Sequence, residues 1–539
     1  MKLIQKIILI LILLTAFFLR AYKLDSFPAI NSDEAAIGYN AYSLLQTGKD
    51  EHGASWPLHF KSFGDFKPGA YFYLSLPFIK VLDLNLLTVR LPNLILSVLT
   101  ILFIYKLVIL LTKNNKLALI SAAVLTFSPW HLHFSRGAWE SSVALSFIVI
   151  GIYFFFKSIE KKFLLNFSLF IIFFSASLYT YHSARIIAPL LALSLFIIYF
   201  NFIKSKIPQI IFPILIGVIL TIPVLFSFLQ NGGSARFNGV GFTSDQGPLL
   251  RSTELLNQHK SLNIINRTID NKRVLYSISW LQKYTSHFDL NFLATSGDYV
   301  PRSKSPDIGQ IHLIDLPFLF LGIIYLLSST IYHRRSKIFI LSFLLIAPLA
   351  ASLTFQAPSA LRALSMVIPI SILIALGIFN FLKIIQNNKF KNIFLIILIL
   401  IYGYSIIYSL DSYFLHYEKR YPTAWQTGFS ELAPYLEQQK NQYQQIYVTN
   451  KYDQPYILFL FFSKYPPQLI QKEIKLTPPD NFGFSTVLNY DKYHFEKINW
   501  EKIPSNSLVI TSDEIVPIEP KKIINFPNGQ PGFKIYSKL

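Results

Sequence analysis

Two adjacent acidic residues, Asp33 and Glu34, are the strongest candidates for chemistry in this sequence. They follow the first apolar segment of the chain and precede an amphipathic stretch, Ala35–Leu45. A carboxylate held where substrate hydroxyl groups arrive can act as a general base. The same residues would also suit the start of a helix, because Ser32 or Asp33 can serve as an N-cap and acids favour the helix dipole there. The pair alone therefore leaves both roles open.

Several basic and polar residues could bind a substrate. They stand near those ends of the predicted helices that lie on the same side of the membrane as the acidic pair. Lysine offers a compact positive charge to a phosphate, and arginine can bind one in a bidentate manner. Their structural role would instead be contact with anionic lipid headgroups or with a neighbouring acid. The candidates for binding a phosphate are Lys67, Arg136, Arg185, Arg302 and Arg362, and those for other substrate contacts are Asp65, His133, Glu140, Tyr181 and Tyr299.

The residue types exclude some chemistry. The sequence has no cysteine, so disulfides, thiolate metal sites and cysteine nucleophiles are excluded. His131 and His133 would point apart on a helix, which favours histidines at the membrane interface over metal ligands. We assign no metal ligand, and the sequence leaves a divalent metal cofactor open.

A large part of the chain is solvated by lipid. Hydrophobic residues make up 52% of the sequence, charged residues only 14%, and the mean hydropathy is +0.42; a soluble chain usually carries about a quarter charged residues. The net charge of +20 could indicate nucleic acid. However, the lysines and arginines stand in short clusters between apolar runs, which is typical of cytoplasmic loops. We predict a polytopic α-helical membrane protein with no nucleic-acid partner.

The apolar runs predict about eleven transmembrane helices, since about 20 residues cross the hydrocarbon core. The first run lacks a cleavage site for a signal peptide and is predicted to be retained. The predicted spans are 3–24, 90–112, 117–134, 140–157, 163–180, 184–203, 207–229, 315–332, 337–355, 361–384 and 391–410.

The basic loops predict the orientation. If the N-terminus is cytoplasmic, every short inward loop carries lysine or arginine, as the positive-inside rule requires. The acidic pair and the C-terminal segment then lie on the extracytoplasmic side. The protein as a whole is predicted to be an integral protein of the plasma membrane. The inward basic residues are Lys113, Lys116, Lys157, Lys161, Lys162, Lys204, Lys206, Arg334, Arg335, Lys337, Lys389 and Lys391.

The chain is predicted to form a transmembrane domain, 1–410, and a small extracytoplasmic α/β domain, 411–539. Two long outer loops interrupt the first domain, at 25–89 and 230–314, and the first holds two stretches that suit helices in the membrane interface. In the C-terminal domain, Gln445–Thr449 and Ser507–Thr511 are predicted strands, and a helix is predicted after Pro455.

The order of motifs resembles that of the GT-C superfamily of glycosyltransferases, specifically protein O-mannosyltransferases and the lipid A aminoarabinose transferase. The Asp33-Glu34 pair and the amphipathic stretch are followed by Gly64–Pro68, an aromatic interface helix, and Arg90–Pro92 at the start of the second span. The resemblance covers roughly residues 1–230 and continues more loosely through Ser359–Leu364. The C-terminal domain matches only in position.

This resemblance implies a donor and roles for individual residues. The donor would be a monosaccharide on a polyprenyl phosphate, transferred with inversion to a protein, lipid or envelope glycan. Asp33 would be the base, Glu34 would orient the acceptor or its neighbours, Lys67 would contact the lipid phosphate, and Arg136 would be a basic partner of the loop acid. The arginine often found after the acidic pair is absent, and Gly69 replaces a second proline after Lys67-Pro68, which leaves the acceptor class undecided.

Two other functions are compatible with the same organisation. An oligosaccharide polymerase or ligase would use residues of the large outer loop, such as Arg302 and His312. A lipid or solute transporter usually needs ionisable residues at mid-membrane depth, and the predicted spans are almost devoid of them away from their ends. A glycosyltransferase that uses a polyprenyl-phosphate sugar is therefore the function that the sequence favours.

Overall fold

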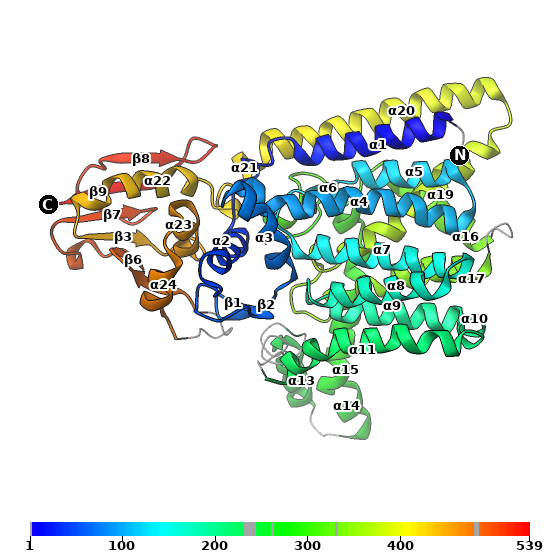
Figure 1. Cartoon of the computed structure of the whole chain (residues 1–539), viewed down its shortest axis with the longest axis horizontal. Helices are drawn as coiled ribbons and strands as arrows, with labels where there is room; N and C mark the ends of the chain where they lie inside the picture. Colours follow the sequence, from blue (N-terminus) through cyan, green and yellow to red (C-terminus); the bar gives the residue numbers. More distant parts are fainter. Residues whose placement is uncertain (1–2, 231–240, 242–243, 260–262, 329–332, 479–484) are drawn as a thin grey trace. The chain divides into compact units, whose positions relative to one another are not determined.

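The computed structural model describes residues 3–230, 241, 244–259, 263–328, 333–478 and 485–539 (Figure 1). Parts of the predicted large outer loop, 230–314, lie outside these ranges. The described chain forms two compact units. Unit 1 comprises 1–19, 96–134 and 140–409, and unit 2 comprises 20–95, 135–139 and 410–539. The predicted division into two domains at residue 410 stays a prediction, since unit 2 combines both.

Unit 1 is helical, and the chain is an integral membrane protein. In the described residues, seven helices are long and apolar enough to cross a membrane. They are α1 (Leu3–Ala21), α4 (Leu86–Thr112), α7 (Glu140–Glu160), α11 (Ile207–Gln230), α17–α18 (Arg334–Ser352), η5–α19 (Leu364–Ile384) and α20 (Asn388–Asp411).

The other four predicted spans are shorter apolar helices. They have 13 to 16 residues, namely α5 (Asn115–Phe127), α8 (Phe163–Leu178), α9 (Ala184–Ile198) and α16 (Asp315–Ser328). Short segments complete this unit: α6 (Pro129–Phe134), α10 (Phe200–Lys204), α13 (Gly247–Gln258), α14 (Ile264–Ile269), α15 (Lys272–Thr285), η2 (Ser286–Phe288), η3 (Asn291–Thr295) and η4 (Pro301–Ser303).

Two glycines allow α16 and α19 to pack with their backbones in contact. A Cβ atom at Gly322 would lie 1.8 Å from the carbonyl oxygen of Leu373, and one at Gly377 would lie 1.9 Å from that of Phe318. Small residues permit such close approach in membranes, where helix association depends on van der Waals packing rather than on the hydrophobic effect. No larger residue fits at either position without separating the helices.

The first part of unit 2 is the segment that contains the acidic pair. It includes α2 (Ser32–Thr47), a hairpin of β1 (His59–Ser62) with β2 (Asp65–Pro68), and α3 (Ala70–Leu82). The predicted interface stretches are thus helices, and α2 is buried along most of its length, against α3 and against helices from the C-terminal part of the chain.

The C-terminal part of unit 2 is a mixed seven-stranded sheet with helices. The strand order is β4-β5-β6-β3-β7-β9-β8, and β3 is parallel to both of its neighbours. The predicted strands correspond to β3 (Gln445–Thr449) and β7 (Ser507–Thr511), and the predicted helix to α23 (Pro455–Ser463). The other described elements are α21 (Tyr417–Arg420), α22 (Phe429–Gln439), α24 (Pro467–Glu473), β4 (Lys475–Leu476), β5 (Val487–Tyr490), β6 (Tyr493–Glu496), β8 (Lys522–Asn525) and β9 (Pro531–Lys538). Short π or 3-10 turns are η6 (Ser412–His416), η7 (Thr423–Trp425), η8 (Lys440–Gln442) and η9 (Trp500–Lys502).

The sheet domain holds the segment with the acidic pair through specific hydrogen bonds. The Tyr39 hydroxyl donates to the Tyr465 carbonyl at 2.8 Å, and the Ser485 amide donates to the Phe63 carbonyl, in the β1–β2 turn, at 3.1 Å. The aromatic rings of Phe63 and Tyr456 also meet edge to face. The position of α2 and of the hairpin therefore depends on residues much later in the chain.

Candidate active site

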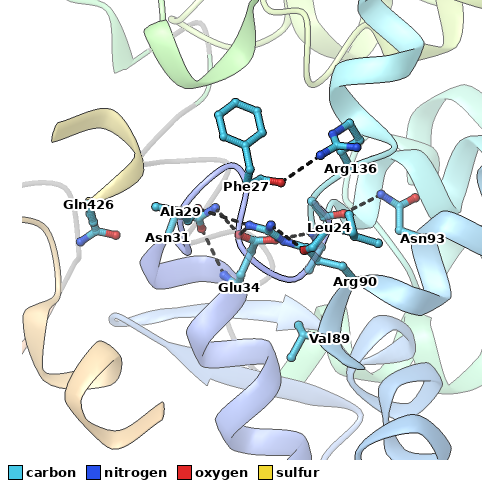
Figure 2. Close-up of polar contacts among 12 residues, drawn as sticks. Leu24, Phe27, Ala29, Asn31, Glu34, Val89, Arg90, Asn93, Arg136 and Gln426 are labelled. Atoms are coloured by element: carbon cyan, nitrogen blue, oxygen red, sulfur yellow. Dashed lines mark hydrogen bonds and ion pairs between the residues drawn. The ribbon is translucent and has the colours of Figure 1, made fainter. Parts of the chain in front are cut away.

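A buried ion pair joins Glu34 of α2 to Arg90 of α4 (Figure 2). The Arg90 Nε lies 2.8 Å from Glu34 Oε1, and one terminal nitrogen lies 2.7 Å from Oε2. The Arg90 side chain is 0% exposed and that of Glu34 is 2% exposed. Arg90 also donates to the carbonyls of Leu24 and Ala29. This bidentate geometry is the form in which a guanidinium can compensate a carboxylate out of water.

Glu34 is further fixed by the start of its own helix. Asn31 is the N-cap of α2: its side-chain oxygen accepts from the Glu34 amide at 3.1 Å, and its side-chain nitrogen donates to Glu34 Oε2 at 3.2 Å. The Ala138 amide donates to Oε1 at 2.7 Å. The expectation that Ser32 or Asp33 caps the helix is therefore wrong, because the chain enters the helix one residue earlier. Both carboxylate oxygens of Glu34 therefore accept hydrogen bonds from neighbouring protein groups.

Asp33 points to a different partner. The ammonium group of Lys67, on β2, forms an ion pair with Asp33 Oδ1, and the Asp33 side chain remains 33% exposed while that of Lys67 is 14% exposed. The Lys67 nitrogen also lies 5.3 Å from the centre of the Phe63 ring. The structure thus brings together the two residues that the sequence proposes as base and phosphate ligand. Asp65, on the same strand, is half-buried, and its carboxylate accepts from the Phe66 amide.

Arg136 belongs to unit 2 and contacts the backbone that precedes α2. Its predicted role as a basic partner of the loop acid stays a prediction, and the cation beside Glu34 is Arg90. Arg136 instead donates to the carbonyls of Arg20, Tyr22 and Phe27, at 3.0, 2.6 and 3.1 Å. Its guanidinium is also 4.7 Å from the centre of the Phe414 ring. This environment fixes the segment that leads into α2, as Figure 2 shows for Phe27.

Two residues of the C-terminal part hold the backbone just before Asp33. The side-chain oxygen of Gln426 accepts from the Ser32 amide at 2.6 Å, and Glu418 accepts from the Ala29 amide at 2.5 Å. Gln426 is 5% exposed and also donates to the Asp453 carbonyl. These contacts set the direction in which α2 begins, and with it the direction of the Asp33 side chain.

A second buried acid lies on the loop between α2 and the hairpin. Glu51 is 0% exposed; Asn40 donates to it at 3.2 Å, and the Asn40 side-chain oxygen accepts from the Glu51 amide at 2.8 Å. The Nε2 atom of His52 lies 3.6 Å from Glu51 Oε1. Burial raises the pKa of Glu51 to about 8 and lowers that of His52 to about 4. Both side chains are therefore neutral near pH 7.

The other candidates belong to unit 1, where some of them share a set of contacts. His133 donates from Nε2 to the Arg302 carbonyl at 2.9 Å, so this histidine contacts the loop backbone, and its predicted substrate contact stays a prediction. The carboxylate of Asp298 accepts from the Val300 and Ala360 amides, and the charge of Arg362 lies near it. Arg362 also donates to Thr354 and Gln356, and Tyr299 is 53% exposed.

The remaining candidates lie at helix ends in unit 1. Arg185 donates to the Leu178 carbonyl at 3.1 Å and lies 3.3 Å from His182 Nδ1. Tyr181 is half-buried in the turn between α8 and α9, and half-buried Glu140 is the first residue of α7. Their predicted substrate contacts stay predictions. Within the described residues, no cluster of three or more His, Asp or Glu side chains could hold a metal ion.

Sequence reasoning missed Arg90 as a site residue, although a signal for it was present. Arg90 stands inside the apolar run that forms α4, and a buried cation requires an acidic partner. Asn31, Gln426 and Glu418 carried no such signal. Asn31 is one of several residues able to cap a helix, and the other two act across nearly the whole length of the chain.

Comparisons with known proteins concern the family and the fold of the chain. Residues 10–232 match the model of the dolichyl-phosphate-mannose-protein mannosyltransferase family. No curated protein matches the sequence of the chain significantly. The fold is similar to that of ArnT from Cupriavidus metallidurans bound to undecaprenyl phosphate, with a TM-score of 0.52 and 9% identity over 98% of this chain and 97% of that chain.

A second similar structure is the archaeal oligosaccharyltransferase AglB from Archaeoglobus fulgidus in complex with an inhibitory peptide and a dolichol-phosphate. Its TM-score is 0.50, with 12% identity over 86% of this chain and 64% of that chain. At such identities the likeness concerns the fold. The predicted GT-C fold and the predicted glycosyltransferase class are confirmed.

Proposed function

We propose that this polyprenyl-phosphate-dependent membrane glycosyltransferase transfers a monosaccharide, with inversion, to an acceptor on the extracytoplasmic side of the membrane. The acceptor is a protein, a lipid or an envelope glycan. The observation that carries the proposal is the Asp33–Lys67 pair at the start of α2. The ArnT structure is bound to undecaprenyl phosphate and the AglB structure is in complex with a dolichol-phosphate. Lys67 would bind a lipid phosphate of this kind here.

The two members of the pair have complementary roles in the transfer. Asp33 takes the proton from the acceptor hydroxyl as that oxygen attacks the anomeric carbon, and the bond from this carbon to the lipid phosphate breaks. The leaving phosphate is a weak base and needs no proton. It needs a fixed cation against its growing negative charge, and Lys67 supplies one. Loss of such a contact costs roughly 3–4 kcal/mol of barrier.

When the donor arrives, its phosphate competes with Asp33 for the Lys67 ammonium group. Release of Asp33 from the ion pair makes its carboxylate a stronger base at the moment the acceptor binds. Glu34 does not take part in proton transfer, because Arg90, Asn31 and the Ala138 amide occupy its carboxylate. It positions Asp33 by fixing the first turn of α2.

Other residues predicted from the sequence would add contacts to the donor or the acceptor. Arg185, Arg302 and Arg362 would add positive charge for the donor phosphate, and Tyr181 and Tyr299 would contact the substrate. The orientation follows from the basic loops, whose positive-inside distribution puts the segment 25–89 outside the cytoplasm.

The test is transfer by the purified full-length protein in detergent, scored as release of free lipid phosphate from a panel of polyprenyl-phosphate sugars. Asp33→Asn should abolish release while leaving the amount of folded protein unchanged. The control is Asp83→Asn, which removes an exposed acid of unit 2, paired with Lys464, and should keep full activity. Near-normal turnover by the Asp33 variant would overturn the assignment of the base.

A further inference from the structure

Unit 1 contains a cavity of about 820 Å³ at the ends of three helices. It lies where α4 and α7 end and α17 begins. Its volume falls within the range of roughly 300–1,000 Å³ typical of ligand sites. The described residues that line the cavity all belong to unit 1, whereas Asp33 belongs to unit 2. The inference below does not rest on the proposed transfer reaction.

The charge of the lining is strongly positive. Among the described residues that line the cavity, Lys113, Arg334, Arg335 and Lys337 are basic and Glu160 is acidic. Glu160 forms an ion pair with Lys113. The three basic residues at the start of α17 therefore give the cavity a positive charge that its own acid does not balance. An anion is the ligand that this charge favours.

The position of these cations in α17 is unfavourable without an anion. Arg334, Arg335 and Lys337 all fall in the first turn of the helix, which has no acidic residue, and the His333 side chain does not cap it. The positive end of the helix dipole repels cations at this place. A bound phosphate would be attracted both by the helix N-terminus and by the three cations. It would thereby offset the repulsion between the cations and the helix dipole.

One guanidinium in the cavity is pre-organised. Arg335 stacks on the ring of Tyr199, 5.5 Å from its centre, and Tyr199 packs edge to face on Phe156. Tyr199 is 7% exposed, so its ring is held in place. A guanidinium fixed in this way loses less side-chain entropy when it binds a ligand.

The walls add an apolar component. Leu110, Phe156 and Ile159 line the cavity beside the basic residues. We propose that this cavity binds a phosphate group at the basic-loop end of unit 1, either as the headgroup of an anionic phospholipid or as free phosphate. A positive-inside loop needs only charge, whereas this site combines charge with a cavity, a stacked arginine and apolar walls.

The test uses the full-length protein in a neutral detergent. Binding of phosphatidylglycerol is measured by native mass spectrometry, and phosphatidylcholine and inorganic phosphate are measured in parallel arms at matched ionic strength. We expect the double variant Arg334→Gln with Arg335→Gln to weaken phosphatidylglycerol binding at least tenfold. The matched control, Lys389→Gln with Lys391→Gln, removes two charges from the first turn of α20 and should leave binding within twofold.

A second variant guards against misfolding or altered insertion of the first. Ile159→Trp narrows the cavity without changing charge and should also weaken binding at least tenfold. Binding of phosphatidylglycerol alone identifies a lipid site, and binding of inorganic phosphate as well identifies recognition of the phosphate group itself; both results support the proposal. Equal loss in the control variant, undiminished binding by Ile159→Trp, or binding of neither anion would overturn it.

Discussion

Replacement of Glu34 by glutamine tests how much the start of α2 depends on the buried ion pair. The substitution keeps the shape of the side chain and removes its charge, while the Arg90 guanidinium remains 0% exposed. Arg90 loses a charged partner at 2.7–2.8 Å on two of its nitrogens. Breaking a buried pair by removing one partner costs about 3–5 kcal/mol. We therefore expect the unfolding equilibrium to shift by about two to four orders of magnitude.

The assay is chemical denaturation in detergent, followed by tryptophan fluorescence, as a double-mutant cycle with Arg90→Met. Removal of both charges leaves no uncompensated ion, so the double variant should be more stable than the sum of the single losses predicts. The coupling energy should reach at least about 2 kcal/mol. The exposed Asp83–Lys464 pair provides the control, because a surface ion pair is worth only about 0–1 kcal/mol.

The reasoning fails if Glu34→Gln unfolds within about 1 kcal/mol of the unmodified protein, as Asp83→Asn should. It also fails if the two single losses simply add in the double variant. Either result would mean that water reaches the pair in solution and that the first turn of α2 has another source of rigidity.

Three more predictions concern neighbouring features. Gln426→Ala removes the acceptor of the buried Ser32 amide, so it should lower the free energy of unfolding by about 1–3 kcal/mol in the denaturation assay. It should also lower turnover more than substrate affinity. Gln426→Glu keeps an acceptor oxygen and should retain part of the stability and part of the turnover that Gln426→Ala loses. Glu51 has a pKa of about 8 in the folded protein and of about 4.3 when unfolded, so the folded state retains a proton that the unfolded state releases. Stability should thus fall as the pH rises from about 4 to 8, and Glu51→Gln should flatten this part of the pH profile of the unfolding midpoint. Gly377→Ala puts a Cβ atom against a carbonyl of the facing helix and should abolish recovery of folded protein, whereas Gly403→Ala, with nothing within 4 Å, should have no effect.

The helices could be predicted from the sequence because they depend on local composition. Each predicted span corresponds to a helix of the described residues, and four of these helices have only 13 to 16 residues. The strands at Gln445–Thr449 and Ser507–Thr511 were also predictable, since their apolar residues form short runs between polar ones. Which side of the membrane each loop occupies stays a prediction.

The candidate site was less predictable because its geometry comes from tertiary contacts. The Asp33–Lys67 pair depends on where the β1–β2 hairpin places Lys67, and the sequence indicated the two residues but not their ion pair. The adjacent Glu34 looks equivalent in the sequence, yet its surroundings differ completely, with Arg90 beside it. No spacing rule distinguishes two neighbouring acids whose side chains leave the helix in different directions.

Unit 2 is built from residues 20–95, 135–139 and 410–539, and this composition has a consequence for the biosynthesis of the protein. The segment with Asp33 is synthesised early, but Gln426 and Tyr465, which hold it, follow after several hundred further residues. At about 5–20 residues per second, the ribosome needs tens of seconds to reach them. During that interval the nascent chain can insert its helices, but the segment with Asp33 lacks these two contacts. We therefore expect activity to be acquired late in assembly, and only in chains that have been translated through the seven-stranded sheet.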